Sequence, residues 1–138
     1  MKTVLFACVH NAGRSQMAAA FFNRLATPDE ARAISAGTIP ADEVHPQVLT
    51  AMWELGIDLS SATPSLLTQE LADGASLLVT MGCGESCPVV PDARVIDWPL
   101  ADPSDQPLDA VRAIRDDIRA RVKALIRAEG WGSHVGAD

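Results

Sequence analysis

A cysteine near the start of the chain occupies a position suited to nucleophilic chemistry. Cys8 ends an apolar run of strand length, residues 3–7, and five residues separate it from Arg14. The alanine-rich stretch 15–22 contains no proline and is typical of a helix. A loop between a strand and a helix N-terminus gathers backbone N–H groups and the positive end of the helix dipole, which bind anions and stabilise a thiolate. The pattern predicts a thiol nucleophile that faces a tetrahedral oxyanion.

The residues of this loop are expected to form the anion site. Their backbone amides would surround the oxyanion, and the planar guanidinium of Arg14 would close the site with two parallel donors. The predicted oxyanion-binding residues are Val9, His10, Asn11, Ala12, Gly13, Arg14 and Ser15. The sequence lacks the glycine patterns of dinucleotide and P-loop nucleotide sites. A packing role is the alternative for an isolated cysteine, and the spacing to Arg14 and Ser15 weighs against it.

Two further thiols follow the third predicted strand. Cys83 and Cys87 are separated by three residues, and glycines flank Cys83 on both sides. With Cys8 and His10 they could supply four metal ligands, but structural zinc sites favour a C-x2-C spacing, so no metal is expected. A structural disulfide is disfavoured in a reducing compartment. The remaining interpretation is a mobile dithiol that exchanges with Cys8, which is a redox relay.

A carboxylate follows the fourth predicted strand. Asp102 precedes Pro103, which disfavours helix at Asp102 and makes residues 98–103 an extended loop. At the carboxyl edge of a sheet Asp102 could protonate a leaving oxygen as a general acid. The alternative is a turn or helix-capping aspartate, and composition alone favours that alternative.

Composition indicates one domain with a substantial core. The chain has 138 residues, of which 48% are hydrophobic, and we expect one domain over 1–129 followed by a mobile tail over 130–138. The formal charge of −7, with no basic patch, argues against nucleic acid or an anionic membrane as partner. No run is long enough to span a bilayer, and Met1 leads into a strand rather than a signal peptide. Three cysteines without a secretion signal indicate the cytoplasm.

Strands and helices alternate along the sequence. Strands are predicted at 3–7, 31–35, 76–81 and 94–96, and helices at 13–25, 46–55, 66–72 and 109–128. The last helix is amphipathic, with an inward face formed by Val111, Ile114, Ile118, Val122, Leu125 and Ile126. This alternation predicts an α/β fold, with a parallel sheet covered on both faces and a ligand site outside the carboxyl ends of the strands.

These motifs resemble the low-molecular-weight tyrosine phosphatase superfamily. The resemblance rests on C-x5-R-S after the first strand, Ser-Ala-Gly-Thr at 35–38 and Asp-Pro at 102–103. Asn11, the run Arg-Ser-Gln-Met-Ala at 14–18 and the paired Cys83 and Cys87 are similar to its arsenate reductase branch. The resemblance covers the chain from about residue 3 to the last helix. It implies a four-stranded parallel sheet with helices on both faces.

The resemblance also implies roles for the site residues. Cys8 would be the nucleophile, Arg14 and the loop amides would hold the oxyanion, and Asp102 would be the general acid. Cys83 and Cys87 would carry the relay, and thioredoxin would reduce it, with no bound cofactor. Asn11 and Ser15 would shape the loop and hydrogen-bond the thiolate of Cys8.

The chain departs from the family pattern in three places. Ala19 stands where some relatives hold potassium through a glutamate, so no ion is carried over. Gly13 replaces a second loop cysteine that some members have, and the spacing of Cys83 and Cys87 is shorter than in the best-known reductases.

Two other functions remain open at this stage. A protein tyrosine phosphatase would use Cys8, Arg14 and Asp102 and would not need Cys83 or Cys87. A non-enzymatic arsenic or redox sensor would use the three thiols and would not need the oxyanion loop.

Overall fold

Four parallel strands form the sheet at the centre of the protein. The structure, a computed structural model, describes residues 2–82 and 94–132. The strands are β1 (Lys2–Cys8), β2 (Ala31–Gly37), β3 (Leu77–Thr80) and β4 (Arg94–Asp97), in the spatial order β2-β1-β3-β4. Cys8 is level with Gly37 on β2, and Ala7 is level with Thr80 on β3. The carboxyl ends of the four parallel strands therefore lie at one edge of the sheet, as predicted.

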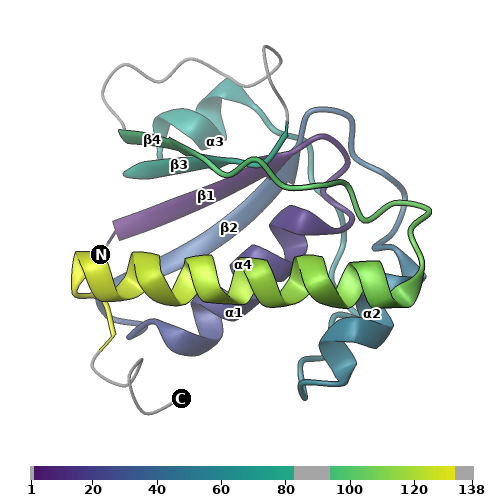
Figure 1. Cartoon of the computed structure of the whole chain (residues 1–138). Coiled ribbons are helices and arrows are strands. Elements are labelled where there is room, and N and C mark those ends of the chain that lie inside the picture. The colour runs from purple at the N-terminus through teal and green to yellow at the C-terminus, as the bar shows by residue number, and fades with distance from the viewer. Residues whose placement is uncertain (1, 83–93, 133–138) are drawn as a thin grey trace.

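Helices cover both faces of this sheet, which confirms the predicted α/β class (Figure 1). The helices are α1 (Arg14–Leu25), α2 (Pro46–Trp53), α3 (Gln69–Asp73) and α4 (Leu108–Glu129). Val4, Phe6 and Cys8 on β1 face the larger core, which is packed under α1, α2 and α4. Leu5 and Ala7 face the smaller core under α3. The alternation of β1 side chains thus sends Cys8 toward α1, the helix that begins at the end of the loop.

The helix expected at 66–72 begins later, at Gln69. Leu66 instead forms an isolated parallel bridge with Gly37, and Leu67 donates its backbone N–H to the Gly37 carbonyl at 2.7 Å. Thr68 then caps α3, because its hydroxyl accepts a hydrogen bond from the backbone N–H of Leu71. Pairing with the end of β2 therefore extends a segment whose local pattern resembles helix.

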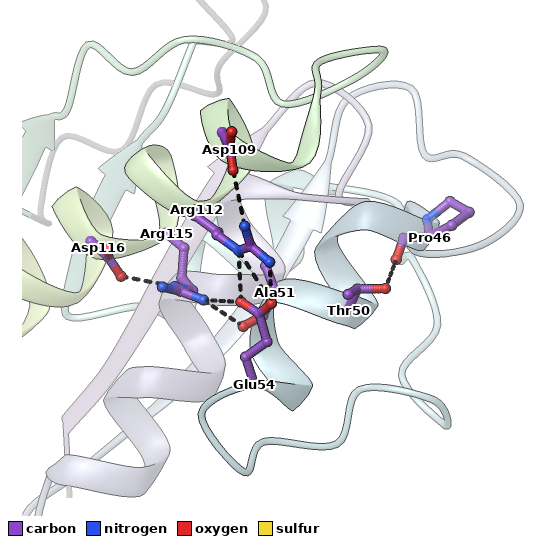
Figure 2. A network of polar contacts seen from close by, with 8 residues as sticks. All are labelled: Pro46, Thr50, Ala51, Glu54, Asp109, Arg112, Arg115 and Asp116. Atoms are coloured by element: carbon purple, nitrogen blue, oxygen red, sulfur yellow. Dashed lines mark hydrogen bonds and ion pairs between the residues drawn. The ribbon is translucent and has the colours of Figure 1, made fainter.

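The long helix α4 has the predicted inward face, and all six of its predicted apolar positions are buried. Arg115 is buried as well, although it is charged. Its guanidinium donates to the Glu54 carboxylate at 2.8 Å and to the Ala51 carbonyl at 2.9 Å. Arg112 contacts the same carboxylate at 2.6 Å, so Glu54 ties the end of α2 to α4 (Figure 2).

This ionic cluster shifts the protonation equilibria of its members. Hydrogen bonding from Arg112 lowers the pKa of Glu54 below its ordinary value, with Arg115 acting in the same direction. The pKa of Arg115 is raised, chiefly by its hydrogen bond to Asp116 and then by Glu54. The charged form of each group is therefore favoured in the folded protein.

The chain continues to pack beyond the end of α4. Gly130 ends the helix in the left-handed conformation, with φ of 72°, as its position in the sequence predicts. Trp131 then packs edge-on against Phe22, with ring centroids 5.9 Å apart, and its carbonyl accepts from Thr27 at 2.7 Å. Residues 133–138 of the expected tail lie outside the described residues. Within the described part of the chain, no helix combines the length and apolarity needed to cross a membrane.

Candidate active site

The loop from Cys8 to Gly13 is held by the segment that follows β2. Backbone N–H groups donate to the carbonyls of Cys8, Val9, His10 and Ala12, at 3.1, 2.8, 2.9 and 2.9 Å. The donors are Thr38, Ile39, Ala41 and His45. The N–H and C=O of one planar peptide unit point in opposite directions, so amides of the loop turn away from this segment. One of them, the N–H of Asn11, donates to the Cys8 sulfur, and the loop has the concave arrangement of amides that is typical of anion sites.

Gly37 allows the loop to approach β2 so closely. A Cβ at this position would lie 2.6 Å from the Val9 carbonyl oxygen and 2.8 Å from the Asn11 nitrogen. Both neighbours are backbone atoms, so only glycine fits at the end of β2. Steric exclusion of a Cβ therefore explains why glycine occupies position 37 in the Ser-Ala-Gly-Thr run at 35–38.

The Cys8 sulfur lies at the base of this concavity. Cys8 is 2% exposed, and its thiol is free. The sulfur accepts a hydrogen bond from the backbone N–H of Asn11 at 3.3 Å and lies 2.8 Å from the Ser15 hydroxyl. The backbone N–H of Asn11 and the hydroxyl of Ser15 are therefore the polar groups that contact the Cys8 sulfur.

Asn11 constrains the hydrogen bonding of the Ser15 hydroxyl beside Cys8. Ser65 donates its backbone N–H to Asn11 Oδ1 at 2.8 Å, and this fixes which side-chain atom of Asn11 is the oxygen. Asn11 Nδ2 then donates to the Ser15 hydroxyl oxygen at 2.7 Å. Because Ser15 accepts this bond, its own proton is free to point at the Cys8 sulfur.

Asn11 adopts a backbone conformation that few side chains tolerate. Its φ is 50°, in the left-handed region where asparagine is enriched. Gln16 supports it, with Nε2 donating to the Asn11 backbone oxygen at 3.1 Å and to Oδ1 at 3.2 Å. Neither Gln16 nor Ser65 is predicted as a site residue from the sequence. Gln16 lies within the Arg-Ser-Gln-Met-Ala run, whereas nothing local marks Ser65.

Arg14 lies beside the loop and is 6% exposed. Its Nη1 donates to the Leu100 carbonyl at 3.3 Å, and its Nη2 lies 3.8 Å from Asp102 Oδ2. Gly82, with φ of 99°, lies against the guanidinium, and a Cβ there would overlap it. Arg14 is therefore positioned by the segments that follow β3 and β4.

Asp102 combines both features considered for it from the sequence. Its Oδ1 accepts the backbone N–H of Ser104 at 2.9 Å, as in a turn aspartate. Its Oδ2 faces Arg14, and the side chain is 46% exposed. The Asp102 carboxylate is therefore half-exposed and lies beside the Arg14 guanidinium.

The structure thus brings Cys8, the loop, Arg14, Ser15 and Asp102 together. Cys83 and Cys87 lie outside the described residues, and Gly82 is the last described residue before them. Among the residues that the structure does describe, no three His, Cys, Asp or Glu side chains are grouped to hold a metal ion.

Comparisons with known proteins find one matching family and similar arsenate reductases. Residues 3–130 match the low molecular weight phosphotyrosine protein phosphatase family. Arsenate reductase 1 of Bacillus cereus is 36% identical over 126 residues, which cover 88% of this chain and 92% of the relative.

Two solved structures have closely similar folds. The thioredoxin-dependent arsenate reductase Cg_ArsC1' of Corynebacterium glutamicum has a TM-score of 0.81 and 38% identity, over 93% of this chain. This chain spans 61% of the length of that protein. The YwlE arginine phosphatase from Geobacillus stearothermophilus has a TM-score of 0.84 and 27% identity, over 94% of both chains.

Proposed function

The chain belongs to the low molecular weight phosphotyrosine protein phosphatase family, and we propose that it is an arsenate reductase of that family. The observation that carries the proposal is the Cys8 sulfur, which faces the anion-binding loop and is within reach of two donors, Asn11 N and Ser15 Oγ. Arsenate is a tetrahedral oxyanion of the kind that this loop fits. The similarity to arsenate reductases supports this choice of substrate.

The first chemical step belongs to Cys8, Arg14 and Asp102. The Cys8 thiolate attacks arsenic, a sulfur–arsenic bond forms, and an arsenic–oxygen bond breaks. Asp102 donates a proton, so that the departing oxygen leaves as water. Arg14 and the loop amides hold the remaining oxygens and stabilise their negative charge.

The reduction itself requires the second pair of thiols. The Cys83 thiolate attacks the Cys8 sulfur, which forms a Cys8–Cys83 disulfide and breaks the sulfur–arsenic bond. The electron pair of that bond stays on arsenic, which leaves as arsenite. The Cys87 thiolate then attacks Cys83, forms the Cys83–Cys87 disulfide and releases the Cys8 thiolate.

Thioredoxin is proposed as the external reductant. Its dithiol would reduce the Cys83–Cys87 disulfide, and no bound cofactor is needed. The thioredoxin dependence of the Corynebacterium glutamicum relative supports this choice. Because the cycle begins from three reduced thiols, it suits the reducing cytoplasm.

The decisive assay measures NADPH consumption that depends on arsenate in the presence of thioredoxin and thioredoxin reductase. Cys8→Ser should abolish turnover. Cys83→Ser should form the Cys8 adduct and release no arsenite in repeated turnovers, whereas Cys87→Ser should release one equivalent. Mass spectrometry of Cys87→Ser after one equivalent of arsenate should detect a Cys8–Cys83 disulfide. Repeated turnover by both Cys83→Ser and Cys87→Ser would contradict the relay.

A phosphatase is the second candidate, because the arginine phosphatase from Geobacillus stearothermophilus has the same fold over nearly the whole chain. Cys8, Arg14 and Asp102 would suffice for that reaction. Efficient hydrolysis of phosphoarginine or aryl phosphates, unaffected by Cys83→Ser and Cys87→Ser and without arsenate reduction, would favour this second function.

A further inference from the structure

Gly13, at the N-terminal cap of α1, is in contact with the segment that carries Asp102. A Cβ at Gly13 would lie 2.6 Å from Pro103 Cγ and 3.5 Å from His45 Cδ2. Both Gly13 and Pro103 are buried. Because Cγ belongs to the proline ring, it cannot rotate away as the end of a flexible side chain could.

We propose that Gly13 is a positioning residue: its missing side chain lets Pro103 dock on the anion loop and so sets the position of Asp102. The proposal rests on the role of Asp102 as general acid given above. It assigns Gly13 a role beyond that of one more backbone amide in the loop.

The Asp102 segment is held at three described points. Trp98 is buried against Phe6, with ring centroids 5.7 Å apart. The Leu100 carbonyl then accepts from Arg14, and Pro103 lies on Gly13. Asp102 itself is about half-exposed, so burial of its own side chain does not fix it.

Local hydrogen bonds hold Asp102 and Pro103 in one turn. Asp102 Oδ1 accepts from Ser104 N at 2.9 Å, and the Pro103 carbonyl accepts from Gln106 N at 3.2 Å. A displacement of the Pro103 ring would therefore carry the carboxylate with it. Pro103 is the anchor adjacent to Asp102 in the chain.

The size of the expected displacement follows from the contact distance. Non-bonded carbon atoms prefer a separation of about 3.5–4.0 Å, so a methyl group at position 13 requires a shift of about 1 Å. A misplacement of about 1 Å in a catalytic group costs about 10²-fold in rate. Gly13→Ala should therefore slow any step that needs the proton from Asp102 by about 10²-fold.

Leaving groups of different basicity separate positioning of the acid from general damage. Phenyl phosphate needs a proton on its leaving oxygen, whereas 2,4-dinitrophenyl phosphate releases a stable anion without one. Hydrolysis of both esters would be measured by single-turnover kinetics, with inorganic phosphate binding measured by calorimetry. Gly13→Ala should slow phenyl phosphate cleavage about 10²-fold more than it slows dinitrophenyl phosphate cleavage, and phosphate binding would report any separate change in the anion loop.

Three further variants make the experiment specific. Gly13→Ala/Pro103→Ala removes the ring and should recover most of the loss relative to Pro103→Ala alone. In an Asp102→Asn background, Gly13→Ala should have no further effect. Gly74→Ala is the matched control, because a Cβ there would lie at an ordinary 3.7 Å from the carbonyl oxygens of Glu70 and Leu71.

The outcomes that overturn the proposal are distinct. Equal losses for the two esters, or a loss that persists in Asp102→Asn, would give Gly13 a role other than positioning the acid. Unchanged cleavage of phenyl phosphate by Gly13→Ala would remove the role altogether. If Gly13→Ala does not fold, the double variant is compared with Pro103→Ala, and a large difference between them contradicts the proposal.

Failure of the proposed function would be seen separately. The unmodified protein would then cleave aryl phosphates and would not consume NADPH with arsenate and thioredoxin. If it cleaves neither ester, the same variants are compared by single-turnover arsenite release, and equal rates for Gly13→Ala and the parent protein overturn the proposal.

Discussion

The backbone N–H of Ser65 donates to the side-chain oxygen of Asn11 at 2.8 Å, although the two are 54 positions apart in the sequence. This bond orients the Asn11 amide so that its nitrogen faces Ser15. The Ser15 hydroxyl, which accepts from this nitrogen, lies 2.8 Å from the Cys8 sulfur. A backbone group from the segment before α3 thus orients the amide that contacts Ser15 beside the nucleophile.

Asn11→Asp tests this arrangement with almost no change in shape. An oxygen replaces the donor that faces Ser15, so Ser15 is expected to turn its proton to the new carboxylate and away from Cys8. Hydrogen bonds to charged groups are worth about 1.5–3 kcal/mol, so adduct formation at Cys8 should slow by about 10- to 150-fold. Rapid-quench single-turnover kinetics would measure the rate of adduct formation.

Asn23→Asp is the matched control for that variant. The Asn23 side-chain amide donates to the Ala33 carbonyl at 3.0 Å and accepts from the Ala33 N–H at 2.8 Å, near the C-terminal end of α1. The Asn23→Asp variant should have a lower melting temperature and an unchanged rate of adduct formation at Cys8. If Asn11→Asp reacts at the normal rate, Asn11 does not control the donor to Cys8.

Arg14→Lys tests the planar guanidinium. Lysine keeps the charge and loses the paired donors, and it also loses the hydrogen bond to the Leu100 carbonyl. We expect arsenate reduction to fall by about 10- to 150-fold, which corresponds to about 1.5–3 kcal/mol for charge-assisted hydrogen bonds. Steady-state kinetics with thioredoxin would measure the change, and Arg24→Lys, on exposed α1 surface, is the control. Near-normal activity in Arg14→Lys would exclude two-donor recognition.

Gly37→Ala tests the packing of β2 against the loop. The new methyl group would lie within 2.6 Å of the Val9 carbonyl oxygen and 2.8 Å of the Asn11 nitrogen. Overpacking of this kind costs about 1–3 kcal/mol, and the loop should lose its affinity for phosphate as it shifts. Chemical denaturation and calorimetry with inorganic phosphate would report the two effects. Ordinary phosphate affinity in Gly37→Ala would mean that the loop tolerates the displacement.

The ion cluster on Glu54 gives stability a defined pH dependence. The pKa of Glu54 is lower in the folded protein than in the unfolded chain, chiefly through Arg112. Its contribution is therefore fully present above the unfolded pKa and is lost as the pH falls through the folded pKa. Glu54→Gln should lower the melting temperature at pH 7 and have little effect below the folded pKa. Glu43→Gln, at an exposed site, is the control, and a pH-independent effect of Glu54→Gln would contradict the linkage.

The elements that carry the nucleophile can be predicted from local sequence patterns. The apolar run before Cys8, the C-x5-R-S spacing and the helix that follows are all local, so the placement of Cys8 at a strand end and helix N-terminus could be predicted. The inward face of α4 was predictable for the same reason, since helical periodicity repeats within the helix itself. The parallel sheet follows from the alternation of strands and helices.

The assembly of the loop, Asn11 and Arg14 into a site depends on tertiary contacts between distant segments. The carbonyls of the loop are turned outward by residues 38–45, Asn11 is oriented by Ser65, and Arg14 is held by Leu100. The start of α3 was also decided in this way, because Leu66 pairs with Gly37 rather than continuing the helix. Each of these contacts joins segments far apart in the sequence. No local propensity encodes such contacts, because their partners are defined only when the sheet brings the loops to one edge.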